Sequence, residues 1–298
     1  MEKMTFLKKW YIRLTQFKWI VGIAEFDNEV VINPAKRLTI HWIKKIPKNS
    51  WFADPIILDE TDNTITLLVE EYFYSNHKGR ISKLVVNRIT WCLEQIIPII
   101  DIETHLSFPV YYRLEDKVFI YPESTKSGSL TLYEYNDNEG SAKPVAVICN
   151  YPLADAVILK IQGRNYLMAT TSPMDNGKIL DFYPLDDPYS GPEFKVAFKT
   201  NVARNAGLPF IVDNRLFRPA QDCTKSYGSC VVIQELTVKE KMVDFKDIKS
   251  FKSPLLRFHE GFHTFNVFNN KLVAVDAEGF RYGFLAQIIH LIRELFRR

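Results

Sequence analysis

Five stretches of this sequence resemble one another, and this repeat restricts the possible folds more than any other feature. Each stretch reads as a short apolar strand, a tight polar turn and a second strand. The copies recur about every fifty residues, a period typical of repeat architectures. They begin at Ala53, Ser107, Ala154, Asn205 and Phe262.

After the second strand, four of the copies continue with a glycine and a third strand, and a less regular fourth strand follows. Four strands in each of five units predict an all-β fold, a five-bladed β-propeller. The last unit is too short for four strands. We therefore expect the N-terminal segments "KWIVGIAEF" and "RLTIHWIKKI" to complete it and close the ring. A pair of β-sandwiches is the alternative, although sandwiches do not require matching turns and glycines.

The two ends of the chain show a different periodicity. Leu7, Trp10, Leu14 and Phe17 recur at helical spacing, and so do apolar residues in "FLAQIIHLIRELFRR". We predict a short amphipathic helix at 1–18, the propeller at 19–283 and a second amphipathic helix at 284–298. These helices can dock on the propeller. Their basic faces with aromatic and leucine residues also fit peripheral contact with an anionic membrane surface.

Composition narrows the class of protein. The chain has 298 residues, of which 47% are hydrophobic and 24% charged, as in soluble globular proteins. A net charge of +3 is too small to predict a nucleic-acid partner. No apolar run is long enough to span a bilayer, and lysines interrupt the N-terminal apolar run that a signal peptide needs. The four cysteines form no CxxC pair, so we predict reduced thiols in a cytoplasmic protein, peripheral at the inner membrane surface if the helices bind there.

Polar and acidic residues recur at the two positions of each unit that open at one mouth of a propeller. The first strand of each blade lines the central channel and the second runs back beside it, so the start of the first and the end of the second lie together. First-strand starts hold Asp54, Phe108, Asp155, Asn205 and His263. Arg218 and Gln221 lie close to the second-strand ends, which hold Glu70 or Glu71, Glu123, Thr171, Asp222 and Asp276.

Carboxyl groups that converge in a funnel with aromatic walls raise one another's pKa through burial and like charge. One protonated carboxyl group can then protonate a leaving oxygen, while another activates water or attacks carbon. The structural interpretation is that Asp at the start of a strand caps backbone amides. No histidine or cysteine spacing predicts a metal site and no glycine-rich turn predicts a nucleotide, so we expect no cofactor.

The strings "WFADPIIL", "YPES", "ADAVIL" and "RPAQDC" resemble the β-propeller domain at the N-terminus of plant glucosamine inositolphosphorylceramide transferases. Related bacterial proteins are free-standing chains associated with polysaccharide synthesis. The resemblance covers roughly residues 19 to 282. In the plant proteins a separate C-terminal domain is the glycosyltransferase, and we expect no counterpart of it here. The resemblance implies a glycan or other sugar-containing ligand and a glycosyltransferase partner, without assigning a reaction.

More distantly, the sequence is similar to five-bladed propeller glycosidases of the arabinanase and invertase group. That resemblance implies Asp54 as base or nucleophile and Asp155 as the residue that tunes pKa values. Near the start of the fourth blade, where that group has its acid, this chain has Asn205, which cannot donate a proton as a general acid. Either Glu123 or Asp222 takes that role, or the hydrolytic machinery is incomplete.

We therefore predict Asp54, Glu123 and Asp155 as catalytic residues. The predicted substrate-binding residues are Glu70, Phe108, Asn205, Arg218, Gln221, Asp222 and His263. Three hypotheses remain open: a carbohydrate-active enzyme of hydrolysis or transfer, a non-catalytic glycan-binding module, and a scaffold whose acids are structural.

Overall fold

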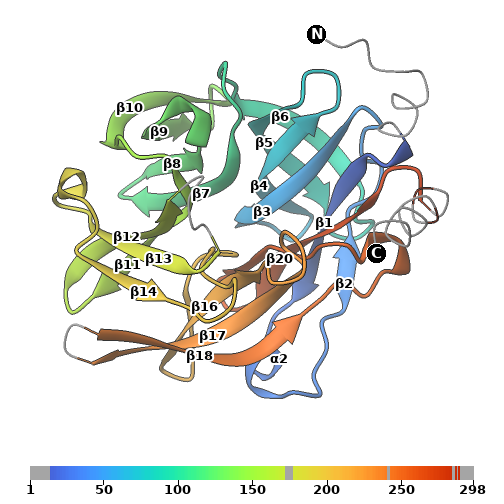
Figure 1. Cartoon of the computed structure of the whole chain (residues 1–298). Helices are drawn as coiled ribbons and strands as arrows, with labels where there is room; N and C mark the ends of the chain where they lie inside the picture. Colours follow the sequence, from blue (N-terminus) through green and yellow to red (C-terminus); the bar gives the residue numbers. More distant parts are fainter. Residues whose placement is uncertain (1–13, 172–176, 240–241, 284–285, 287, 289–298) are drawn as a thin grey trace, which may run out of the picture.

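Twenty strands form five four-stranded antiparallel sheets around a common axis in the computed structural model, which describes residues 14–171, 177–239, 242–283, 286 and 288 (Figure 1). Each sheet is one blade, and the five blades follow one another around the ring in chain order. The predicted five-bladed β-propeller is therefore confirmed, and the pair of sandwiches is excluded.

Blades 1 to 4 each use four consecutive strands, with the first strands β3, β7 and β11 meeting near the axis. Blade 1 contains β3 (Ser50–Glu60), β4 (Thr64–Phe73), β5 (Lys78–Asn87) and β6 (Leu93–Ile100). Blade 2 contains β7 (Ser107–Leu114), β8 (Lys117–Glu123), β9 (Leu130–Asn136) and β10 (Ser141–Cys149). Blade 3 contains β11 (Leu153–Ile161), β12 (Arg164–Thr171), β13 (Ile179–Pro184) and β14 (Phe194–Ala197). Blade 4 contains β15 (Phe210–Val212), β16 (Arg215–Asp222), β17 (Cys230–Lys239) and β18 (Met242–Phe251).

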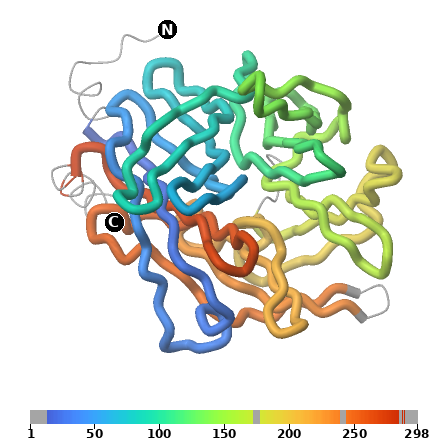
Figure 2. The backbone as a smooth tube through the Cα atoms, turned by 180° about the vertical axis from the view of Figure 1, so that it is seen from behind, coloured from blue at the N-terminus to red at the C-terminus, as the bar shows by residue number. Residues whose placement is uncertain are grey.

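Blade 5 closes the ring with strands from distant parts of the sequence. Its order is β19 (Phe265–Phe268), β20 (Leu272–Phe280), β1 (Phe17–Glu25) and β2 (Ile40–Trp42). β1 pairs with β20 along its whole length, and Figure 2 shows the blue and red segments side by side from behind. The predicted closure by N-terminal strands is confirmed.

The structure corrects one part of the terminal prediction. Phe17 and Lys18, which we expected at the end of an N-terminal helix, belong to β1, because their backbone pairs with Phe280 and Gly279. Most of both predicted terminal helices lies outside the described residues. Within the described residues the named helices are short: α2 (Glu29–Ile32), η1 (Thr125–Ser127), η2 (Pro188–Ser190) and η3 (Leu256–Phe258). No helix in this described part has the length and apolarity to cross a membrane.

The hydrophobic core is divided among the faces between adjacent blades. Strand β4 shows how this division of the core requires a nearly continuously apolar strand sequence. Ile65, Leu67 and Val69 pack between blades 5 and 1, whereas Leu68 faces the cluster between blades 1 and 2. Because successive side chains of a strand point to opposite faces, a strand held between two blades must be apolar on both.

Candidate functional site

Three first strands contain, near their start, a residue in the left-handed backbone region. The φ angles are 51° at Asp54, 44° at Phe108 and 50° at Asp155. A register shift interrupts the pairing of β3, β7 and β11 at the same point, so each strand is bulged there. A non-glycine residue in this region costs about 1–3 kcal/mol, and such residues persist only where their surroundings hold them.

Carboxyl groups of the preceding blade hold these three residues. The amide of Asp54 donates to Asp276 Oδ2 at 3.0 Å, and the amide of Phe108 donates to Asp54 Oδ2 at 2.9 Å. The amide of Asp155 donates to Glu123 Oε2 at 2.9 Å. The structural interpretation of the repeated acids is therefore correct in part, since each link ties one blade to the next. These links use one oxygen each of Asp276, Asp54 and Glu123, so the structural interpretation does not explain the other carboxyl oxygens.

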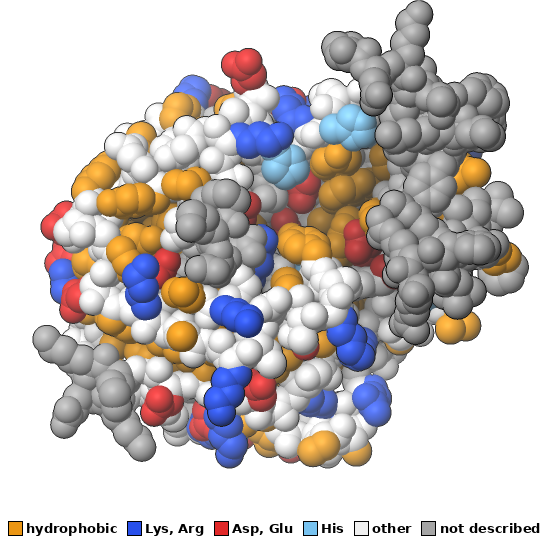
Figure 3. Space-filling view, in the orientation of Figure 1, with side chains coloured by type: hydrophobic (Ala, Val, Ile, Leu, Met, Phe, Trp, Pro, Cys, Tyr) orange, Lys and Arg blue, Asp and Glu red, His pale blue; other side chains and the backbone are white. Residues whose placement is uncertain are grey.

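The acids at this end form one cluster, which we call the acidic rim. It consists of Asp54, Glu70, Glu123, Asp155 and Asp276. Their mutual repulsion is strong enough to shift several of their pKa values, so the acids of blades 1, 2, 3 and 5 lie close together. The side chains keep little exposure, from 0% at Asp276 to 13% at Glu123. On the face seen in Figure 3, acidic side chains lie in a hollow bordered by histidine and hydrophobic side chains.

His263 and Asp276 form the buried centre of the acidic rim. Asp276 Oδ2 lies 2.8 Å from His263 Nδ1, and Asp276 Oδ1 accepts the amides of His263 and Thr264 at 3.1 and 3.0 Å. The Trp19 ring stacks on the imidazole with centroids 3.9 Å apart. Burial alone would lower the pKa of His263, but Asp276 outweighs it and raises this pKa to about 9. The imidazole is thus cationic at neutral pH.

The same centre offers potential metal ligands. One ligand atom each of Asp54, His263 and Asp276 lies within 4.8 Å of the others. However, the charged imidazolium already supplies a cation to both carboxylates, and His263 Nε2 is 3.7 Å from Asp54 Oδ1. A metal ion would have to displace that proton, because histidine binds metals through its neutral form.

Glu70 adds a further buried carboxyl group to the acidic rim. Burial and the nearby charge of Asp54 hold the pKa of Glu70 well above its usual range, and the two carboxyl groups are hydrogen-bonded. His105 accepts the Gly79 amide at Nδ1 (2.9 Å), which directs its Nε2 toward Glu70 Oε1 at 3.5 Å. Gly79 is required here because a Cβ atom would lie 2.7 Å from Glu70 Oε1 and 2.5 Å from a backbone carbonyl oxygen.

Glu123, Asp155 and Arg204 form the second part of the site. Arg204 Nε lies 2.5 Å from Asp155 Oδ2, and Arg204 Nη2 lies 3.8 Å from Glu123 Oε2. Burial and the charge of Asp155 raise the pKa of Glu123 to about 8, even though Arg204 opposes the shift. At neutral pH this site therefore combines a proton donor, an acceptor and a fixed cation.

An exposed aromatic ring borders this group. Tyr227 is 52% exposed, its ring lies 5.2 Å from the Arg204 guanidinium, and it meets His263 edge-on at 5.6 Å. A flat exposed ring beside donors and acceptors is suited to the apolar face of a sugar.

Comparison with known sequences places this chain in a family. The profile described as "Glucosamine inositolphosphorylceramide transferase 1, N-terminal" matches residues 30–271. The chain belongs to this family. It is 28% identical to glucosamine inositolphosphorylceramide transferase 1 of Arabidopsis thaliana over 222 residues, which cover 71% of the chain and 28% of the plant protein. The protein of the same name from Oryza sativa subsp. japonica is 27% identical over 207 residues, 64% of the chain and 27% of that protein. The chain thus spans little more than a quarter of these relatives.

Solved structures support the fold alone. An exo-beta-1,3-galactanase from Phanerochaete chrysosporium has a TM-score of 0.50 at 7% identity, covering 72% of this chain and 54% of the galactanase. A GH43_1 enzyme from Xanthomonas citri complexed with xylose has a TM-score of 0.50 at 9% identity, covering 78% and 88% of the two chains. At these identities the family member described here shares an architecture with them.

Two predicted binding residues pack inside the protein. Arg218 is fully buried and donates to Asn205 Oδ1 and to Gln234 Oε1, each at 2.7 Å. Asn205 is also fully buried and donates to the carbonyl oxygens of Asp155 (2.8 Å) and Met168 (2.9 Å). Because these partners already engage both side chains, the geometry gives neither a place in the site. At the start of the fourth blade, the Asn205 side-chain amide therefore links blade 4 to blade 3.

The remaining predicted residues have local roles. Gln221 donates to the Asn205 carbonyl at 2.9 Å, and its buried Oε1 has no hydrogen-bond partner among the described residues. Asp222 accepts the Thr224 amide at 2.8 Å within its own turn. The Phe108 ring packs in the core, and only its amide meets the acidic rim.

Sequence reasoning left Arg204 and Asp276 out of the predicted binding set. Asp276 lies toward the end of a second strand, as Glu70 and Glu123 do, so the same rule predicts its position at the rim. Arg204 immediately precedes Asn205, and no sequence signal indicated which of these two neighbours faces the rim.

Proposed function

We propose that the acidic rim binds a sugar ring of a glycan or glycolipid, and that recognition is the function of this site. The observation that carries the proposal is the combination of the buried Glu70 carboxyl group, protonated Glu123, the Asp155–Arg204 ion pair and the exposed Tyr227 ring. Sugar hydroxyls both donate and accept hydrogen bonds, and such a set meets both needs. The relatives, each named glucosamine inositolphosphorylceramide transferase 1, support a carbohydrate context.

Three features favour recognition over hydrolysis. Asn205 supplies no acid from the fourth blade, and its amide is buried. Arg204 holds Asp155 at 2.5 Å, so this carboxylate is already neutralised. One oxygen of Asp54 accepts the Phe108 amide, and the other lies 3.4 Å from the Thr264 hydroxyl.

One observation supports catalysis as the second candidate. Glu123 with a pKa of about 8 would act as a general acid at neutral pH, while Asp54, raised by burial to a pKa of about 6, would be ionised as base or nucleophile. This pairing follows the logic of glycoside hydrolysis or transfer, in which one carboxyl group is protonated and the other charged.

Ligand-detected NMR with glucosamine, N-acetylglucosamine, galactose and xylose tests the proposal on the full chain. We expect at least one sugar to bind saturably. Tyr227→Ala should weaken it about fivefold through lost ring contact, without lowering Tm. Tyr189→Ala is the matched control, because Tyr189 is 53% exposed but lies at the other end of the propeller. Failure of these sugars and their oligosaccharides to bind would overturn the proposal.

Nitrophenyl glycosides separate the two candidates. Recognition predicts binding without turnover. Turnover that disappears in Glu123→Gln and in Asp54→Asn, with the fold retained, would establish the catalytic candidate instead.

The remaining expectations about this chain stay predictions. They are association with a glycosyltransferase, a cytoplasmic location and peripheral membrane contact through the terminal segments.

A further inference from the structure

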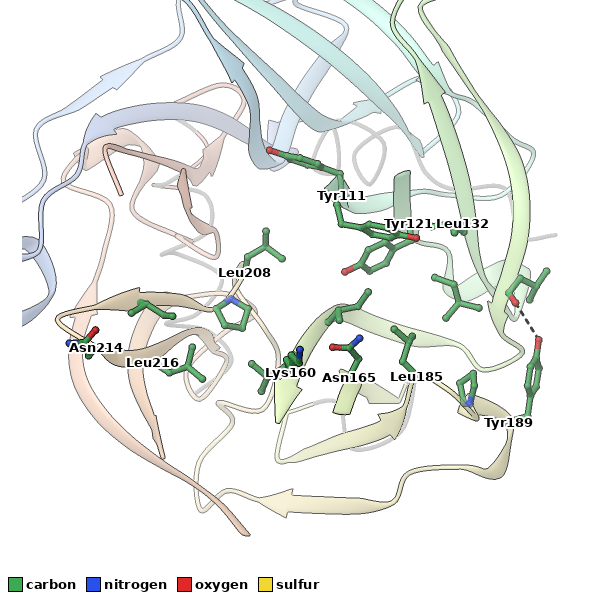
Figure 4. Close-up of a pocket in the computed structure, with 18 residues that line it drawn as sticks. Tyr111, Tyr121, Leu132, Lys160, Asn165, Leu185, Tyr189, Leu208, Asn214 and Leu216 are labelled. Atoms are coloured by element: carbon green, nitrogen blue, oxygen red, sulfur yellow. Dashed lines mark hydrogen bonds between the residues drawn. The ribbon is translucent and has the colours of Figure 1, made fainter. Parts of the chain in front are cut away.

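A second cavity, which we call the apolar groove, opens at the end of the propeller opposite the acidic rim. It has a volume of about 970 Å³ and is lined by strands and loops of blades 2, 3 and 4 (Figure 4). Strand β11 connects the two sites: Asp155 near its start belongs to the rim, and Lys160 near its end lines the groove. The two positions are about 16 Å apart at the rise of a β-strand.

The walls of the apolar groove are carbon-rich and partly open to solvent. Val147, Tyr189 and Ile211 line it and are 47%, 53% and 57% exposed, an unusual amount for large hydrophobic residues in one place. The hydroxyl groups of Tyr111 and Tyr189 already donate to backbone carbonyl oxygens, at 2.9 and 3.3 Å. These tyrosines therefore offer their rings to a ligand.

One polar pair interrupts this lining. Lys160 and Asn165 are register partners on β11 and β12 and lie side by side on one wall in Figure 4. Leu216 lies to one side of the pair and Leu185 to the other, and Tyr111 and Tyr121 face it across the groove. Lys160 is exposed and has no ion-pair partner within the described part of the chain.

The geometry points to a binding site for a single-chain anionic amphiphile, a long-chain fatty acid, with its carboxylate at Lys160 and Asn165 and its chain along the apolar groove. An unpaired ammonium group and a neighbouring amide can both donate to a carboxylate. The volume lies at the upper end of the range for small-molecule sites, enough for a long alkyl chain. A sugar or a nucleotide fits poorly, because the described residues that line the groove offer one cation and few other polar partners.

This inference is independent of the sugar-binding proposal, and displacement of a fluorescent fatty acid from the full chain tests it. Palmitate should displace the probe and bind more tightly than hexadecanol, which has the same chain without the charge. Each shortening by two methylene groups, to myristate and then laurate, should weaken binding about tenfold, since buried methylenes supply the affinity.

Two pairs of variants assign the contacts. Lys160→Gln should weaken palmitate about five- to tenfold and leave hexadecanol unchanged, whereas Lys199→Gln, an exposed lysine on the outer part of blade 3, should change neither. Tyr189→Ala should weaken both amphiphiles, whereas Tyr227→Ala at the rim should weaken neither.

The proposal is overturned if palmitate does not bind saturably, or if palmitate and hexadecanol bind equally in the wild type and in Lys160→Gln. Binding to anionic phospholipid vesicles that free palmitate does not compete would also overturn it, in favour of a membrane surface.

Discussion

Arg204 and Arg218 lie close together in sequence and are both enclosed by protein, yet their surroundings differ in kind. Arg204 faces Asp155 and Glu123, which hold its pKa well above the usual value despite burial. Arg218 donates its hydrogen bonds to neutral partners, Asn205, Gln234 and backbone carbonyls, and burial lowers its pKa to about 9 although the more distant Asp155 and Asp247 oppose the shift. Burial alone therefore does not identify a functional arginine. The charge of its partners is the better criterion, and by it Arg204 belongs to the proposed site and Arg218 to the scaffold.

The largest expected effect is on stability at Arg218. Arg218→Met keeps the apolar stem but leaves Asn205, Gln234 and two carbonyl groups without their donor. The free energy of unfolding should fall by about 4 kcal/mol, measured by urea denaturation. Sugar binding by the remaining folded protein should be unchanged. A loss below about 1 kcal/mol would remove the distinction between scaffold and site.

A double-mutant cycle on the rim gives the next largest effect. Arg204→Gln should cost about 3 kcal/mol, because it leaves the buried Asp155 carboxylate without its cation. Asp155→Asn in that background should restore part of the loss, with a coupling energy of about 1–3 kcal/mol. Additive effects of the two substitutions in urea denaturation would show that the ion pair contributes nothing of its own.

The pH dependence of stability gives a third test, and it should belong to the rim. His263 has a folded-state pKa of about 9, above its usual 6.5, so its contribution is complete below pH 6.5 and lost as pH rises through 9. Glu123, raised from 4.5 to about 8, also binds more protons in the folded state and acts with the same sign between those values. The free energy of unfolding should therefore fall as the pH rises from 5 to 9.

Two variants separate these contributions. Between pH 8 and 9 His263 contributes more of the slope than Glu123, so His263→Gln should flatten that part of the curve more than Glu123→Gln does. Stability that rises over pH 5–9 would contradict the assigned pKa shifts.

The sequence predicts the architecture well because blade formation depends on a pattern repeated five times. Alternating apolar residues, turns and glycines place the strands, and the short last unit requires β1 and β2 to complete blade 5. Asp54, Glu123 and Asp155 are also placed correctly at one end, since strand starts and ends alone determine that position.

The details of the site depend on the direction of single side chains at bulges and loops. The repeat pattern does not predict these directions. A shift of one residue exchanges the two faces of a strand. Arg204 and Asn205 are neighbours in sequence, but Arg204 lies at the rim and Asn205 is buried beneath it. For the same reason Arg218, close to a rim position in sequence, turns into the interior.

The pairing of β1 with β20 has a consequence for biosynthesis. Ile20, Val21, Ile23 and Ala24 of β1 are buried in the finished ring, but their partner strand lies at 272–280. At ribosomal speeds, on the order of ten seconds or more of elongation separate the two strands. The nascent chain must therefore carry β1 with one edge unpaired, beside β2 only, while four blades assemble, and the ring becomes a single cooperative body only when its first strand meets one of its last.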